Sequence, residues 1–113
     1  MTTVYERLVQ SVDQRDIDLY QSLLHADYRF IRHQSNSEMN RAQMIEMVNM
    51  MFNAEGVNFL SRRCIYENSD ILVEHTVMDF PDSTRESIIS VHQLKDGQII
   101  RTETGATLIK TDD

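Results

Sequence analysis

The chain has 113 residues, of which 41% are hydrophobic and 26% are charged, and its formal net charge is −7. This length predicts one domain, residues 1–113, with a core large enough to fold unaided. Lys and Arg are scattered along this acidic chain, so phosphate backbones would be repelled and we expect no nucleic-acid partner.

Targeting and cofactor signals are missing from the sequence. The N-terminal residues lack the basic start and apolar run of a secretory signal, and no later stretch is long and apolar enough to span a bilayer. We therefore expect a cytoplasmic protein with no membrane partner. Cys64 is the single cysteine, and no nucleotide fingerprint or phosphate-cradling glycine loop is present. We accordingly expect no metal and no cofactor.

The first half of the chain predicts three helices. Side chains suited to helix capping stand at Thr3, Asp16 and Asn40, each followed by apolar residues at helical spacing. The first helix is predicted to run through Asp13, the second to end before His25, and the third to stop at Gly56. Between the second and third helices, a short strand is predicted over 28–32 and a polar loop over 33–38.

From Val57 onward the apolar period changes to two, which predicts strands. Asp96-Gly97 between alternating apolar residues is a strong signal for a β-hairpin. Helices followed by consecutive antiparallel strands indicate an α+β domain with the helices against one face of the sheet. The predicted strands cover residues 57–66, 71–80, 85–94 and 98–109.

Short segments along the whole chain resemble the SnoaL-like, or nuclear transport factor 2-like, superfamily, which includes steroid delta-isomerase and limonene epoxide hydrolase. This resemblance implies a cystatin-like cone: a curved antiparallel sheet wrapped around three N-terminal helices, with a pocket inside. It also implies a homodimer through the outer face of the sheet. The segments that carry it are residues 8–12, 15–18, 23–24, 27–30, 40–42 and 95–101.

The catalytic groups of these relatives are not matched. Where the resemblance places the oxyanion-donating tyrosine, the general base and the second oxyanion donor of the isomerases, this chain has Leu8, Arg32 and Val91. Proton abstraction by the isomerase route is therefore not expected. The epoxide hydrolases activate water with a set of an acid, an arginine and a second acid. The segment of this chain whose spacing comes nearest to that set is 101–103, which has the arginine and one acid.

The turns predict which residues share a face of the sheet. A two-residue loop at Asp96-Gly97 would put Val91 opposite Thr102, and an even-numbered loop before residue 85 would put Glu74 on the Val91 face and His75 on the His92 face. A register slip of one residue would reverse this assignment.

Both predicted faces are too apolar to be left to water, so we expect one to line a pocket and the other to meet a second subunit. Arg32 and Glu74 are the predicted polar anchors for a ligand, although they could instead form a structural ion pair. The predicted pocket residues are Tyr28, Arg32, His33, Met47, Met51, Glu74, Thr76, Val91 and Thr102, and the predicted interface residues are His75, His92, Arg101 and Glu103.

Three functions are compatible with this pattern. The first is binding of a small, mostly apolar molecule. The second is a lyase, isomerase or hydrolase that acts on a small apolar substrate by acid/base catalysis, with His33 and Glu74 as the candidate catalytic residues and the His75 and His92 pair as another option. The third is a dimeric protein-interaction module that uses the apolar outer face.

Overall fold

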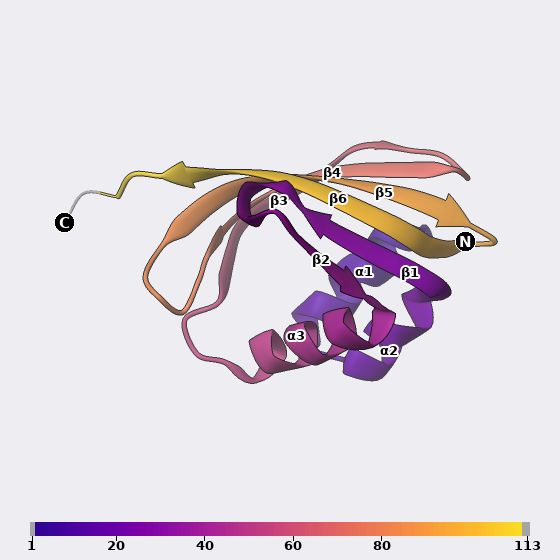
Figure 1. Cartoon of the computed structure of the whole chain (residues 1–113), viewed down its shortest axis with the longest axis horizontal. Helices are drawn as coiled ribbons and strands as arrows, with labels where there is room; N and C mark the ends of the chain where they lie inside the picture. Colours follow the sequence, from indigo (N-terminus) through magenta and orange to yellow (C-terminus); the bar gives the residue numbers. More distant parts are fainter. Residues whose placement is uncertain (1, 112–113) are drawn as a thin grey trace.

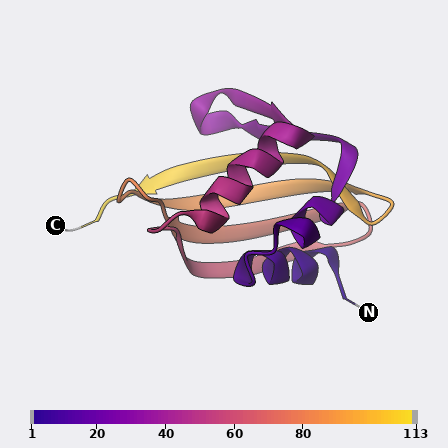
Figure 2. The ribbon, with the colours of Figure 1, turned by 90° about the horizontal axis from the view of Figure 1, so that it is seen from below.

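A computed structural model describes residues 2–111, in which three helices lie on one side of a curved six-stranded sheet (Figures 1 and 2). The sheet curls around the helices without closing on itself, as Figure 1 shows. The elements in chain order are α1 (Val4–Asp13), α2 (Ile17–Leu23), β1 (Leu24–Arg32), a 3₁₀ turn η1 (His33–Ser35), β2 (Ser37–Asn40), α3 (Arg41–Asn53), β3 (Asn58–Glu67), β4 (Ile71–Asp79), β5 (Arg85–Lys95) and β6 (Gln98–Ile109).

The three predicted helix starts are confirmed by their caps. The side chains of Thr3 and Asp16 accept hydrogen bonds from backbone N–H groups at the starts of α1 and α2. Asn40 forms a complete capping box with Gln43, in which each side chain accepts from the other residue's backbone N–H at 2.9 Å. These caps satisfy N–H groups that the helices themselves leave free.

The strand order is β2-β1-β6-β5-β4-β3, and β1 runs parallel to β6 while the other pairs are antiparallel. The sheet is therefore mixed. The α+β prediction is confirmed, but the sequence missed β2, whose first two residues fall in the predicted polar loop. Four mostly polar residues on an edge strand carry little periodic signal.

The predicted register between the last three strands is wrong, although the hairpin turn is right. Asp96 and Gly97 have φ angles of 53° and 76°, which suit a two-residue turn, and Lys95 pairs with Gln98. Ile100 then has no partner, because Leu94 pairs with Ile99 while Gln93 pairs with Arg101. This bulge shifts every later pair by one residue. A shift of one residue exchanges the side chains that face the two sides of the sheet.

The loop between β4 and β5 also differs by one residue from the predicted length, which changes the pairing of β5 with β4. Asp79 pairs with Arg85, so five residues separate the paired ends where an even number was predicted. As a result His92 lies opposite Leu72 on one side and Thr102 on the other. The prediction that His92 lies on the outer face is therefore wrong. His92 lies on the concave face, together with Glu74.

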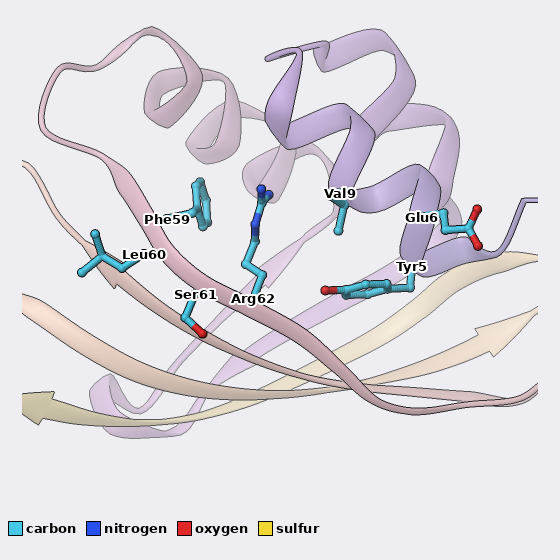
Figure 3. A pocket seen from close by; sticks show the side chains of 7 residues that line it. All are labelled: Tyr5, Glu6, Val9, Phe59, Leu60, Ser61 and Arg62. Carbon is cyan, nitrogen blue, oxygen red and sulfur yellow. The ribbon is translucent and has the colours of Figure 1, made fainter.

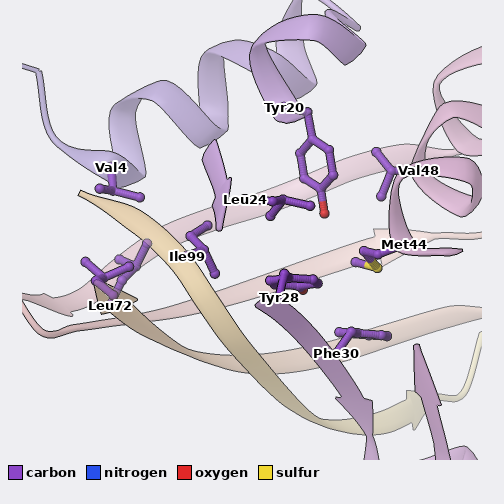
Figure 4. Close-up of a cluster of buried hydrophobic side chains, with 10 residues drawn as sticks. Val4, Tyr20, Leu24, Tyr28, Phe30, Met44, Val48, Leu72 and Ile99 are labelled. Atoms are coloured by element: carbon purple, nitrogen blue, oxygen red, sulfur yellow. The ribbon is translucent and has the colours of Figure 1, made fainter. Parts of the chain in front are cut away.

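The core lies between the helices and the concave face (Figure 4). Leu23 and Leu72 are fully buried, and Ile99 and Leu24 are nearly so. A second, smaller cluster of Val57, Met78 and Ile88 lies at the other end of the sheet. Space remains between these packed regions. Among the described helices, none is long and apolar enough to cross a membrane, and the cytoplasmic location stays a prediction.

Candidate functional site

A cavity of about 230 Å³ lies between the three helices and the concave face of the sheet. Ligand pockets for drug-sized molecules are typically larger than about 300 Å³, so this cavity suits a smaller molecule. The helices contribute apolar side chains, including Met47, Val48, Met51 and Phe52. The strands contribute further apolar side chains and, apart from Tyr20 of α2, all of the polar ones, which are Tyr28, Arg32, Arg62, Glu74, Thr76, Ser90, His92, Thr102 and Thr104.

A chain of three hydrogen-bonded side chains crosses the cavity floor. His92 Nε2 lies 2.6 Å from Glu74 Oε2, and His92 Nδ1 lies 2.7 Å from Thr102 Oγ1. The His92 and Glu74 side chains are only 8% and 11% exposed. An ionised Glu74 can only accept, so Nε2 carries the proton that it donates, and in a neutral imidazole Nδ1 then accepts from the Thr102 hydroxyl. Glu74 Oε1 has no hydrogen-bond partner within residues 2–111.

The strands place this chain of residues by register. His92 pairs directly with Thr102 across β5 and β6, while Glu74 pairs with Ser90, the next residue of β5 on the concave face. Glu74 and His92 are therefore diagonal neighbours on adjacent strands, a separation that long side chains can bridge. The sequence assigned Glu74 and Thr102 to the pocket but not His92, because its predicted register was off by one.

Two buried tyrosines border the same space (Figure 4). Burial raises the pKa of Tyr28, and Thr102 opposes this increase in part. Burial also raises the pKa of Tyr20 well above its ordinary value, and Tyr28 and Glu74 raise it further. Both hydroxyls are therefore neutral at physiological pH and can donate hydrogen bonds.

Arg32 and Glu74 both line the cavity but do not pair with each other. Arg32 Nη2 lies 3.3 Å from each carboxylate oxygen of Glu86 on β5, and Glu74 pairs with His92. The structural ion pair that the sequence left open for Arg32 thus exists with a different acid. Glu86 was missed because its place opposite Met78 depends on the same loop between β4 and β5.

The structure divides the remaining predicted pocket residues. Met47, Met51 and Thr76 line the cavity. Val91 lies opposite Glu103 and so on the outer face, and the His33 side chain is 62% exposed and bonds Glu103 at 3.1 Å. Neither is a lining residue of the cavity, so their predicted place in the pocket is corrected.

The remaining predicted interface residues lie on the outer face. His75 Nε2 is 2.8 Å from Ser87 Oγ, and its Nδ1 is 3.4 Å from Arg63 Nε. The pKa of Glu103 is lowered, first by its hydrogen bond with His33 and then by Arg101, which lies 3.6 Å away. Within residues 2–111, no three His, Cys, Asp or Glu side chains form a group that could hold a metal ion.

A second hollow lies on the surface between α1 and β3 (Figure 3). Arg62 rises from β3 toward α1 there, next to the Phe59 ring. The Arg62 Cζ atom is 5.0 Å from the centre of that ring, and Nη2 pairs with Asp13. The sequence did not single out Arg62, because two irregularities in the pairing of β3 with β4 obscure which residues point inward.

A curved sheet around three helices with a cavity on its concave face defines the cone class of α+β domains. The chain belongs to the family of SnoaL-like domains, whose family model matches residues 5–102. This confirms the resemblance that the sequence indicated. No curated protein matches the chain.

Several solved structures share this fold. A nuclear transport factor 2-like protein of unknown function from Burkholderia xenovorans is 13% identical, with 97% of this chain and 87% of that chain covered and a TM-score of 0.75. A protein with a ketosteroid isomerase-like fold from Catenulispora acidiphila is 12% identical, with coverage of 92% and 86% and a TM-score of 0.68. A limonene epoxide hydrolase-like epoxide hydrolase from M. tuberculosis is 13% identical, with coverage of 92% and 80% and a TM-score of 0.69. At these identities the likeness establishes the fold alone.

The two buried tyrosines predict an alkaline limit to stability. Because their pKa values are raised on folding, they stabilise the protein below pH 10, the ordinary tyrosine value, and this stabilisation is lost as the pH rises above 10. We expect Tyr20 and Tyr28 to ionise only as the chain unfolds, so ultraviolet absorbance of tyrosinate should rise together with the loss of circular dichroism. In Tyr28→Phe this cooperative step should be smaller. Complete ionisation of all tyrosines in the folded protein would contradict the assignment.

Proposed function

We propose that this domain binds a small, mostly apolar molecule in the cavity between the helices and the sheet. The observation that carries the proposal is the cavity itself, which is walled by apolar side chains and has a hydrogen-bonded acid inside it. Contact with these walls would remove apolar surface of the ligand from water, which stabilises the complex by about 25 cal/mol for each Å² that is buried.

Polar atoms on the cavity lining indicate which hydrogen-bonding groups the ligand has in addition to its apolar body. Glu74 Oε1 lacks a hydrogen-bond partner within residues 2–111, and Thr104 Oγ1 is buried without one. A buried polar atom such as Thr104 Oγ1 is costly when unpaired. A ligand with a hydroxyl or N–H group near Glu74 would supply the missing bond, so we expect an apolar body with at least one hydrogen-bond donor.

Filling the cavity should abolish binding. Val48 lies on the cavity wall and Met50, on the same helix, is 67% exposed. We expect Val48→Phe to weaken binding of indole at least tenfold and Met50→Phe to leave it unchanged. The chain has no tryptophan, so indole fluorescence reports the ligand alone. Thermal denaturation controls for overpacking, which costs about 1–3 kcal/mol. Equal affinity in both variants would contradict binding in this cavity.

We infer acid/base catalysis as a second candidate function, because of the hydrogen-bonded chain of Thr102, His92 and Glu74. A carboxylate in an apolar cavity, oriented by an imidazole, is suited to remove a proton from a bound molecule. His92 would stabilise the position of the carboxylate and Thr102 that of the imidazole. Oε1, the free oxygen of Glu74, is the atom that would take the proton.

A reaction that needs only one base tests this candidate. When a base takes the C–H proton of 5-nitrobenzisoxazole, the N–O bond breaks and a nitrile and a phenolate form. We expect the protein to accelerate this elimination over an equal concentration of acetate, and Glu74→Gln to lower the rate about 10²- to 10⁴-fold. Glu103→Gln is the matched control, because Glu103 also pairs with a histidine but on the outer face. Equal rates in the two variants would exclude Glu74 as the base.

We also propose that the outer face of the sheet forms a homodimer interface. In support, Ile89 is 40% exposed, and Val73, Val77 and Val91 are only half-buried on the same face. Apolar residues that cluster on an exposed sheet face are typical of an interface.

A charge in the centre of this face should separate the subunits. We expect the wild type to have twice the chain mass by light scattering and Ile89→Lys to have the mass of one chain. Leu108→Lys, at an apolar residue with 66% exposure near the end of β6, is the control and should keep the wild-type mass. A wild type that is monomeric at all concentrations would overturn the proposed dimer.

A further inference from the structure

Arg62 lies where the cavity meets the outside of the molecule. Arg62 and Phe59 line the cavity, the hollow between α1 and β3 in Figure 3, and a third hollow beside Asp13 and Phe52. These two side chains therefore form part of the wall between the cavity and both surface hollows, and no other described residue lines all three spaces. A molecule that enters or leaves at this side passes the Arg62 guanidinium.

The contacts of this guanidinium are incomplete. Nη2 pairs with Asp13, whose side chain is 55% exposed, and the Phe59 ring packs 5.0 Å from Cζ. Nη1 is buried and has no hydrogen-bond partner among the described residues. A buried N–H donor without a partner is destabilising, and a charged donor more so. The stacked ring holds the planar group in place, so little freedom would be lost when an acceptor binds.

We propose that Arg62 binds the carboxylate of an amphipathic ligand whose apolar body occupies the cavity. This inference rests on the proposed binding function and names the chemical class of its ligand. A guanidinium presents N–H donors in a fixed fork that matches the geometry of a carboxylate. The exposed ion pair with Asp13 is weak in water, so it competes little with a partly buried carboxylate.

The electrostatics of the cavity then set the orientation of the ligand. Arg62 pairs with Thr76 across β3 and β4, and Glu74 is the next residue of β4 on the concave face. Burial raises the pKa of Tyr5, the Glu74 charge raises it further, and the Arg62 charge opposes this increase, so Tyr5 lies within the field of both groups. An anionic head is attracted to Arg62 at the rim and repelled by Glu74 on the floor. The ligand is therefore bound with its carboxylate outward and a donor group toward Glu74.

Two ligands with the same apolar body test the role of Arg62. We expect 4-phenylbutyrate to bind the wild type at least tenfold more tightly than 4-phenylbutanamide, measured by calorimetry. Arg62→Gln should weaken binding of the carboxylate about ten- to one-hundred-fold and change binding of the amide less than threefold. Arg63→Gln removes the same charge from the adjacent residue, which is exposed and contacts His75 on the outer face. It should change neither affinity.

The outcomes separate this inference from the proposed function. If both compounds bind the wild type and Arg62→Gln loses neither affinity nor preference, Arg62 is not the anchor, while binding in the cavity stands. If neither compound nor indole binds, the proposed function itself is wrong. Should Arg62→Gln fail to fold, Arg62→Met keeps an apolar stem beside Phe59 without the charge, and an undiminished preference for the carboxylate in that variant overturns the inference.

Discussion

The pairing register of β5 against its two neighbours determines the chemistry of the whole cavity. Because side chains alternate between faces, a shift of one residue would move His92 to the outer face and Val91 to the cavity. The unpaired Ile100 and the five-residue loop after Asp79 fix the observed register. With it, the concave face carries Glu74, His92 and Thr102 in one hydrogen-bonded chain, and the outer face keeps its valines.

Charged groups that line an apolar cavity require partners, and each of them has one: the sheet supplies two of these partners and the end of α1 supplies the third. His92 pairs with Glu74, Glu86 pairs with Arg32, and Asp13 at the end of α1 pairs with Arg62. Removing the partner of the buried Glu74 carboxylate would cost about 3–5 kcal/mol, because its charge would be left alone, whereas the more exposed pair of Arg62 and Asp13 contributes little. The helices meanwhile present apolar side chains. The polar groups of the cavity thus lie mostly on its strand side, while most of the lining is apolar, an arrangement that suits amphipathic molecules.

The elements whose signals are local could be predicted from the sequence. The caps Thr3, Asp16 and Asn40 and the Asp96-Gly97 turn each depend on a few adjacent residues, and all four were found. The site depended on longer-range geometry. A bulge adds one residue without a distinctive sequence, so His92 was assigned to the wrong face and the pair with Glu74 was missed. The place of Arg62 depends on how an irregular edge strand meets α1, which no local pattern records.

The candidate site also differs from the isomerases in where its acid lies. Leu8 and Arg32 stand where the resemblance placed a tyrosine donor and an aspartate base, and Val91 points outward. Glu74 lies instead in the middle of β4, where the sheet rather than a strand end supports it. The carboxylate there faces the cavity from the floor of the cone. The same fold therefore encloses a cavity whose acidic side chain comes from a different wall, which is how one architecture can serve many chemistries.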